Sequence, residues 1–396
     1  MHAEVVEKRR WISEERFLHA LNFCMLLPGP EAQQLATYIG WFLHGTSGGV
    51  AAGAFFVLPA AVILWALSWL YMAGGNLAWI AAIFYGLQPA VIAIVAAALL
   101  RIGGKALKNP LMWLVAALAF SAIFFFQLPF VFIIFAAALL GLAGGRIRPD
   151  LFIAIKGPGA DSADITEAER WPSAWRTVRV VAVCLVLWSA PIVLAGFLRG
   201  WDDLLVQEGI FFSKAALITF GGAYAVLPYV AQQAVDHYRW LETSQMMAGL
   251  ALAETTPGPL IMVLQFVGFV GAWQNPGTLP PLLAGTLGAA ITTWTTFLPS
   301  FLFVLGGAPF IERMRHLKAL NAALSTITAA VVGVILNLAV WFGQHVLFPA
   351  PGRPDFYAMI LAAVFFFGLW KARWNVISVV IAGGLLGLAR KLLFGF

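Results

Sequence analysis

Long apolar runs separated by short polar segments make up most of this chain. A transmembrane helix needs roughly 20 apolar residues. Runs near this length lie at about 17–43, 48–73, 78–100, 111–127, 129–143, 177–198, 208–233, 244–273, 280–306, 323–347, 356–371 and 375–393. The pattern predicts an all-α polytopic membrane protein with about twelve membrane segments.

One polar stretch interrupts the runs near the middle of the chain. Residues 144–176 carry five basic and five acidic side chains around a Gly-Pro-Gly sequence. We interpret this stretch as a hydrophilic linker. It would join a first repeat at 1–143 to a connecting helix at 177–198 and a second repeat at 199–396, each repeat having about six helices.

The two halves resemble each other in sequence. A shift of 229 residues places Pro28-Gly29-Pro30 on Pro257-Gly258-Pro259 without a gap. In the following run, Phe56-Val57-Leu58-Pro59 resembles Thr296-Phe297-Leu298-Pro299. Internal repeats of this kind are typical of secondary transporters.

The loop charges predict how the two repeats are oriented. Three basic residues lie at 101–108, whereas the counterpart near 344–355 holds only Arg353. One loop earlier the order is reversed, with three basic residues at 313–318 and no charge at 71–76. Because Lys and Arg collect in cytoplasmic loops, equivalent loops should lie on opposite sides of the membrane. The sequence therefore predicts inverted-topology repeats.

Both Pro-Gly-Pro elements interrupt apolar runs. Proline removes a backbone donor and clashes with the preceding turn, so each element should end one helix and start another. Glu31 is the one Asp, Glu, Lys or Arg between residues 17 and 100, and Glu254 is the one between 243 and 311. Broken helices in such apolar surroundings must be buried in protein or line a wet cavity. Transporters place their substrate sites at these breaks.

The residues around the breaks can bind an anion. A half-helix that starts at Pro28 or Pro257 exposes unpaired N–H groups and the positive end of its dipole, which suits a tetrahedral oxyanion. Thr255 and Thr256 can add hydroxyl donors, and the amides of Gln33, Gln34 and Gln265 can add further donors. Alternatively, the threonines cap the second half-helix and the glutamines satisfy carbonyls freed by the break.

Lys214, Gly221 and Gly222 are further candidates in the run at 208–233. An ionisable group in an apolar run is a candidate for function, although Lys214 also fits an interfacial lysine that extends to the headgroups. The Gly221-Gly222 pair removes side chains where a broken helix approaches the site closely. Plain close packing of helices is the alternative.

The two acids are expected to play different parts. Glu31 stands in the first turn after its break, where the helix dipole stabilises negative charge whatever the function. Glu254 precedes its break, where the dipole disfavours a carboxylate. We therefore assign proton coupling to Glu254 and a structural or gating part to Glu31.

Composition narrows the class of protein. The chain is 61% hydrophobic and 11% charged, with a mean hydropathy of +0.88 and a net charge of +6. The positive charge fits cytoplasmic loops of a membrane protein, and no basic tract supports nucleic-acid binding. Cys24 and Cys184 both lie in apolar runs without paired spacing. No cluster of His, Cys, Asp and Glu has ligand spacing, so we expect no metal, no cofactor and no enzyme activity.

One segment of the second repeat has no counterpart in the first. The segment that contains Phe220-Gly221-Gly222 would map to positions before Met1. We expect a further span with a Phe-Gly-Gly element upstream of this start.

These motifs together resemble a known family. Phe220-Gly221-Gly222, the segment Glu254–Pro259 followed by Gln265-Phe266-Val267-Gly268, and the segment from Asn22 to Leu35 are similar to the two-domain chromate ion transporters. The resemblance covers both halves. It implies a multi-pass carrier of the bacterial inner membrane that exports chromate, driven by the proton-motive force, with sulfate as a look-alike substrate. It leaves a homodimer open.

Other functions use the same features. Sulfate or another divalent oxyanion would use the same donors as chromate. A channel or a non-transport subunit of a membrane complex would also be apolar and repeated, but it would not require paired helix breaks with one acid each.

Overall fold

A computed structural model describes the chain except for residues 75–76, 153–173, 221, 308–317, 350–352 and 396. The elements of the described part are all helices, as expected. In the first half they are η1 (Ala3–Lys8), α1 (Glu14–Leu26), α2 (Glu31–Gly74), α3 (Ala78–Ala106), α4 (Pro110–Phe124), α5 (Phe130–Ile147) and α6 (Pro149–Phe152). In the rest they are α7 (Ala174–Arg199), α8 (Leu204–Ile218), α9 (Ala223–Gln232), η2 (Gln233–His237), α10 (Thr243–Thr255), η3 (Leu260–Met262), α11 (Val263–Gln274), α12 (Pro281–Gly307), α14 (Lys318–Leu347), α15 (Phe356–Trp370) and α16 (Val376–Phe394).

Seven of the described helices are long and apolar enough to cross a membrane: α2, α3, α5, α7, α12, α14 and α16. These seven helices do not show the twelve crossings expected from the apolar runs. Three runs, at 17–43, 208–233 and 244–273, are each divided into shorter helices by a break. Two others, at 111–127 and 356–371, form the 15-residue helices α4 and α15. Most of the linker and the basic residues Arg313 and Arg315 lie outside the described residues.

The run at 17–43 folds back on itself. The Arg16 guanidinium lies 4.3 Å from the centre of the Phe42 ring. Further along, the rings of Phe23 and Tyr38 lie 6.2 Å apart between centroids. The early residues of α1 therefore meet later residues of α2, so the two helices are antiparallel. The break at 28–30 is the tip of a helical hairpin and not a kink within one crossing.

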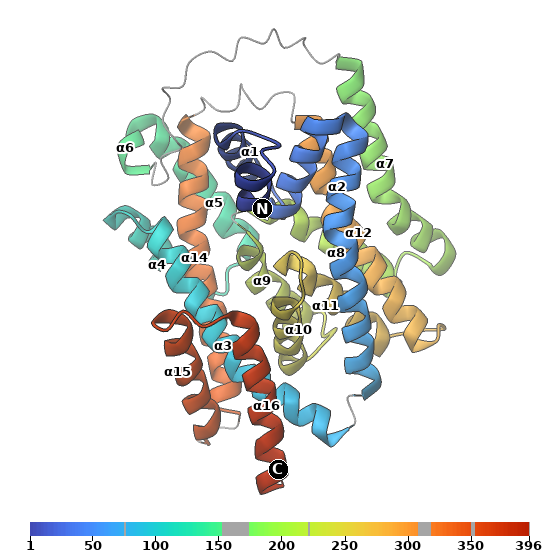
Figure 1. Ribbon diagram of the computed structural model, residues 1–396, viewed down its shortest axis with the longest axis vertical. Helices are drawn as coiled ribbons and strands as arrows, with labels where there is room; N and C mark the ends of the chain where they lie inside the picture. Colours follow the sequence, from blue (N-terminus) through green and yellow to red (C-terminus); the bar gives the residue numbers. More distant parts are fainter. Residues whose placement is uncertain (75–76, 153–173, 221, 308–317, 350–352, 396) are drawn as a thin grey trace.

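After this hairpin, α2 turns a second time. His44 and Gly45 leave helical geometry, and Gly45 has a φ of 66° that suits glycine. The chain then returns alongside itself, with Gly40 against Gly48 and Gly53 against the Thr37 side chain. Absent side chains at these glycines let the two segments approach closely. The remaining part of α2 is a long straight crossing (Figure 1).

The second broken run, at 244–273, also forms a helical hairpin. Gly249 of α10 lies against the ring of Phe266 in α11, and Gly271 of α11 lies against Trp240, just before α10. Helices α10 and α11 are therefore antiparallel, with residues 256–259 at their tip. The chain then turns again into α12, and Gly268 packs against Gly288.

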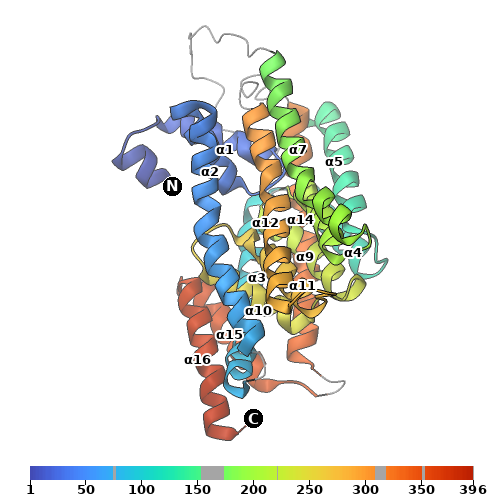
Figure 2. The same ribbon diagram turned by 90° about the vertical axis from the view of Figure 1, so that its right-hand side faces the viewer.

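The crossing helices α2 and α12 lie side by side in opposite directions (Figures 1 and 2). The Trp65 indole donates a hydrogen bond to the Thr286 hydroxyl at 3.0 Å. Towards the other end of this helix pair, Gly49 faces Leu305. A Cβ added to Gly49 would lie 3.0 Å from the Leu305 side chain. This register places Val57 opposite Phe297, and these two residues occupy equivalent positions in the two sequence repeats.

The largest core surrounds α14. This helix packs on α3, α4, α5 and α9, and its Phe342 is fully buried. Helices α15 and α16 pack on α3 at the opposite end of the molecule from the α2 turn (Figure 1). Gly86 of α3 touches Gly383 and Gly387 of α16 so closely that no side chain fits. Large apolar side chains cover the outer faces, such as Phe132 and Phe197, as expected for helices that face lipid.

Candidate functional site

The first hairpin tip, Pro28–Pro30, is held by two other parts of the chain. The Gly29 N–H donates to the Thr219 carbonyl at 2.7 Å. The Gln34 amide donates to the Pro28 carbonyl at 2.7 Å and lies 3.4 Å from the Ser300 hydroxyl of α12. Gly29 has a φ of 119°, which side chains rarely adopt. These contacts hold the first tip against α12. The backbone conformation at Gly29 requires glycine.

The second hairpin tip, Pro257–Pro259, is held by α2. Gly258 has a φ of 150° and lies directly against Ala60. Nearby, the Gln265 amide donates to the Ala61 carbonyl at 2.8 Å. Both tips are therefore held by the crossing helix of the other half of the chain.

These two tip contacts are equivalent in sequence. Ala60 directly follows Pro59, Ser300 directly follows Pro299, and the two prolines align in the repeats. Each contact point lies three residues from the place where Val57 opposes Phe297. With a helical rise of about 1.5 Å per residue, the two contacts are about 9 Å apart along the helix pair.

A third break lies between the tips. Helix α8 ends at Ile218, and α9 begins after Gly222, which has a φ of 95°. The Thr219 carbonyl contacts the first tip, as described above. On the other side, the Tyr224 hydroxyl donates to the Glu254 carboxylate, directly before the second tip. The segment 219–224 therefore bridges the two hairpins.

The start of α2 attracts negative charge at the first tip. The first three N–H groups of α2 have no partner within the helix, and the dipole adds partial positive charge there. They belong to Glu31, Ala32 and Gln33. The charge of Arg101, near the end of α3, also acts on Glu254 and Tyr224. Gly29 and Pro30 are buried, whereas Pro257 and Gly258 are exposed, so the two tips differ in access.

Comparison with known proteins identifies the family. The sequence profile of the chromate transporter family matches residues 1–142 and 206–388. The chain belongs to the chromate transporter family. It is 32% identical to a chromate transport protein of Pseudomonas aeruginosa over 98% of this chain and 86% of that protein. It is 28% identical to one of Cupriavidus metallidurans over 89% of this chain and 78% of that protein.

A probable chromate transport protein of Synechococcus elongatus is 27% identical, over 96% of this chain and 87% of that protein. No solved structure matches the chain. The family is one of transporters and not of enzymes. Within the described part of the transporter, no group of three or more His, Cys, Asp or Glu residues could hold a metal ion.

The expected side-chain donors are already engaged in the transporter. The Thr255 and Thr256 hydroxyls both donate to carbonyls of α10, at 2.8 Å and 3.0 Å in their shorter bonds. The Gln34 and Gln265 amides donate to backbone carbonyls, and the Gln33 amide donates to Thr37 at 3.2 Å. The threonines bond back to the end of α10 and do not cap the following half-helix, whereas Gln34 and Gln265 donate to backbone carbonyls as the alternative expected.

The glycine and lysine candidates differ in placement. Gly222 shapes the third break, and Gly221 lies outside the described residues. Lys214 is on the exposed side of α8. The structure therefore brings the tips, the glutamines and Glu254 together but places the Lys214 side chain on the outer surface.

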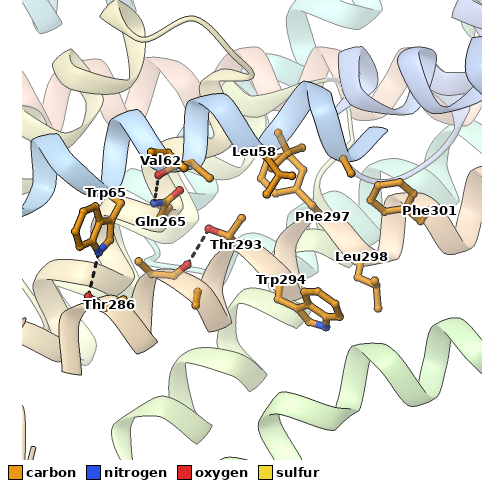
Figure 3. Close-up of a pocket in the computed structure, with 15 residues that line it drawn as sticks. Leu58, Val62, Trp65, Gln265, Thr286, Thr293, Trp294, Phe297, Leu298 and Phe301 are labelled. Atoms are coloured by element: carbon orange, nitrogen blue, oxygen red, sulfur yellow. Dashed lines mark hydrogen bonds between the residues drawn. The ribbon is translucent and has the colours of Figure 1, made fainter. Parts of the chain in front are cut away.

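An apolar groove of the transporter lies between α2 and α12 (Figure 3). It has a volume of about 420 Å³ and is lined by aliphatic and aromatic side chains such as Leu58, Trp65 and Trp294. Gln265 is the polar side chain that reaches it from α11. An apolar groove open to the outside suits lipid chains and not an oxyanion, so we place the anion site at the tips.

One acid was absent from the expected candidates. Glu208 of α8 is fully buried, and neither carboxyl oxygen has a hydrogen-bond partner among the described residues. The sequence signal was available, because Glu208 is the acid at the start of an apolar run.

Proposed function

We propose that this protein is a secondary active carrier that exports chromate across the bacterial inner membrane, driven by the proton-motive force. The observation that carries the proposal is the pair of proline-glycine hairpin tips, each held by the crossing helix of the other half. Helix N-termini at such tips are natural oxyanion sites. Relatives named as chromate transport proteins support chromate as the substrate. Sulfate or another divalent oxyanion is the alternative.

The anion would lie at the N-terminus of α2 and at the second tip. The donors are the free N–H groups after Pro30 and after Pro259, which carry no net charge. Thr255 and Thr256 would join them by turning their hydroxyls away from the α10 carbonyls. Donors of this kind suit a carrier, because they bind an anion without holding it permanently.

We further propose that the two halves are inverted repeats, with boundaries at 1–143, 144–176, 177–198 and 199–396. The antiparallel course of α2 and α12 supports this, because these helices contain the equivalent Pro59 and Pro299. Alternating access would then rock one half against the other about the shared site.

Glu254 is the proposed proton-coupling group. It lies next to the second tip, accepts a hydrogen bond from Tyr224 and is within the field of Arg101. A proton on its carboxyl would remove a negative charge beside the anion. Glu31, in the first turn of α2, is assigned a structural or gating part.

Uptake of labelled chromate into inside-out vesicles tests the function. We expect uptake that an uncoupler abolishes and sulfate inhibits. Glu254→Gln should retain exchange of chromate for chromate but lose its dependence on the proton gradient. Uptake that is unaffected by the uncoupler would contradict proton coupling, and uptake of sulfate alone would assign the carrier to the other anion.

A further inference from the structure

The buried carboxyl of Glu208 lies in a space made by two glycines. A methyl group placed on Gly271 of α11 would lie 2.9 Å from one carboxyl oxygen. One placed on Gly288 of α12 would lie 2.9 Å from the other. The side chain therefore fills the gap between α8, α11 and α12, with no exposed surface.

The charged groups around Glu208 do not offset the negative charge that its carboxylate would carry. Helices α11 and α12 contain no Asp, Glu, His, Lys or Arg. Asp203 at the start of α8 is the acid whose charge acts on Glu208, and it is paired with Arg199 of α7 at 2.9 Å. From α9, Tyr224 is bonded to Glu254, and Tyr229 stacks on Phe130.

An unpaired carboxylate in such a place is far more costly than a neutral acid. Glu208 therefore carries its proton in this conformation. A group of this kind releases the proton only when the packing around it opens. That is the behaviour required of a proton carrier in an alternating-access cycle.

A row of hydroxyls leads away from Glu208 along α12. Gly288, Thr292, Thr296 and Ser300 follow one another at intervals of four residues, so each is a neighbour of the next on a row inclined to the helix axis. The three hydroxyl residues are all buried. The row begins at the Glu208 carboxyl and ends at Ser300, which touches Gly29 and Gln34 of the first tip.

Among the described residues, two hydroxyls of the row lack the hydrogen bonds that neighbouring threonines make. Thr293 and Thr295 donate to carbonyls of the preceding turn, at 2.7 Å and 2.9 Å. Thr292 and Thr296 have no hydrogen-bond partner among the described residues, although both are buried. Buried hydroxyls without partners are rare in proteins and call for a functional explanation.

The spacing of the row fits relay through water. Side chains four residues apart on a helix are separated by about 5–6 Å between Cβ atoms. One water molecule with two hydrogen bonds of about 2.8 Å spans this distance. Gly288 to Ser300 covers roughly 18 Å along the helix at 1.5 Å per residue. The row thus connects the start of α8, near Asp203, with the first hairpin tip.

We propose that Glu208 is a second proton-carrying site, and that Thr292, Thr296 and Ser300 relay its proton between the Asp203 end of the molecule and the first hairpin tip. This proposal deepens the proposed proton-driven transport and rests on it. The relay moves a proton from one oxygen to the next, so every hydroxyl that accepts a proton passes one on. Glu208 is left as a carboxylate when it gives up its proton, and it becomes neutral again when it takes up the next one; the hydroxyls of the row end each transfer uncharged.

The first test compares variants of the full chain in proteoliposomes. Glu208→Gln keeps the shape but cannot release a proton, so uphill chromate accumulation should be lost while chromate exchange without a gradient is retained. Glu208→Asp keeps a titratable group and should restore part of the accumulation. A purely structural Glu208 would predict the reverse order, with Gln the milder change, and that result would overturn the proposal.

The second test addresses the row of hydroxyls. Thr292→Val and Thr296→Val should each slow proton-driven uptake by about fivefold, as expected for the loss of one hydrogen-bonding hydroxyl, with chromate binding unchanged. Thr295→Val is the matched control, because that hydroxyl is buried on the same helix but bonded to Ile291. Equal slowing by all three variants would overturn the relay.

An infrared measurement separates this proposal from the proposed function. The stretching band of a protonated carboxylic acid should be present in the wild-type protein and reduced in Glu208→Gln. If the wild type shows no uphill transport but the band behaves as stated, the proposed function fails while Glu208 remains a protonated site. If the band is unchanged in Glu208→Gln, the proton assignment fails whatever the transport result.

Discussion

Replacing Gly29 by alanine tests the central contact of the site. The backbone at Gly29 has a φ of 119°, and an added Cβ would lie 2.6 Å from the Ser300 hydroxyl and 2.9 Å from the Gln34 amide. Holding a non-glycine residue in such a conformation costs about 1–3 kcal/mol. Overpacking a tight contact costs a further ~1–3 kcal/mol. We therefore expect Gly29→Ala to lose about 2–6 kcal/mol of stability.

Two companion variants separate these contributions. Gly45→Ala has a φ of 66° but nothing within 4 Å of its added Cβ, so it should show the backbone cost alone. Gly29→Ala combined with Ser300→Ala removes the clashing hydroxyl and should recover about 1–3 kcal/mol. Its remaining loss should then resemble that of Gly45→Ala.

Unfolding of purified protein by SDS titration, with and without chromate, measures both stability and binding. Chromate at about 100 times its Kd should add about 2.7 kcal/mol to the wild type and to Gly45→Ala. The addition should be absent in Gly29→Ala, whose tip is displaced. Equal stability losses in Gly29→Ala and Gly45→Ala would refute the packing argument. Unchanged protection by chromate in Gly29→Ala would refute the placement of the anion at the tip.

Three further predictions follow from the same geometry. Ser47 and Thr278 each lie between a hairpin and the crossing helix that follows it. In a background without Cys24 and Cys184, Ser47→Cys and Thr278→Cys should react with an impermeant maleimide from opposite sides of the membrane. Labelling of both from one side would contradict inverted repeats. Thr255→Val should weaken chromate binding by about fivefold, because the proposed site needs this hydroxyl to turn from the α10 carbonyls to the anion; an unchanged affinity would mean that it stays bonded to α10. Modest shortening of the linker should leave chromate protection against heat intact, because no site residue lies there.

The sequence predicted the breaks well because their chemistry is local. Proline and glycine at 28–30 and 257–259 disrupt helices wherever they occur, and both breaks fall as expected. Gly222 also stands at a true interruption, between α8 and α9. The membrane class followed from the apolar runs, which need no tertiary information.

The hairpins could not be predicted in the same way. An apolar run of 27 residues with a central break reads equally as one broken crossing or as two short antiparallel helices. The choice depends on contacts between distant residues, such as Phe23 with Tyr38 and Gly40 with Gly48. For the same reason the direction of the Lys214 side chain and the partners of Thr255 were not visible in the sequence.

Each tip is held by the crossing helix of the other half, so the tip contacts link the two halves mechanically. Ala60 and Ser300 lie on opposite sides of the point where Val57 faces Phe297, about 4.5 Å from it along each helix. A rocking of α2 against α12 about this point therefore carries the two contacts in opposite directions. In the proposed alternating-access cycle, one tip would be withdrawn from the centre as the other advances. The proposed site would then open towards one side of the membrane as it closes towards the other, which a carrier requires and a channel does not.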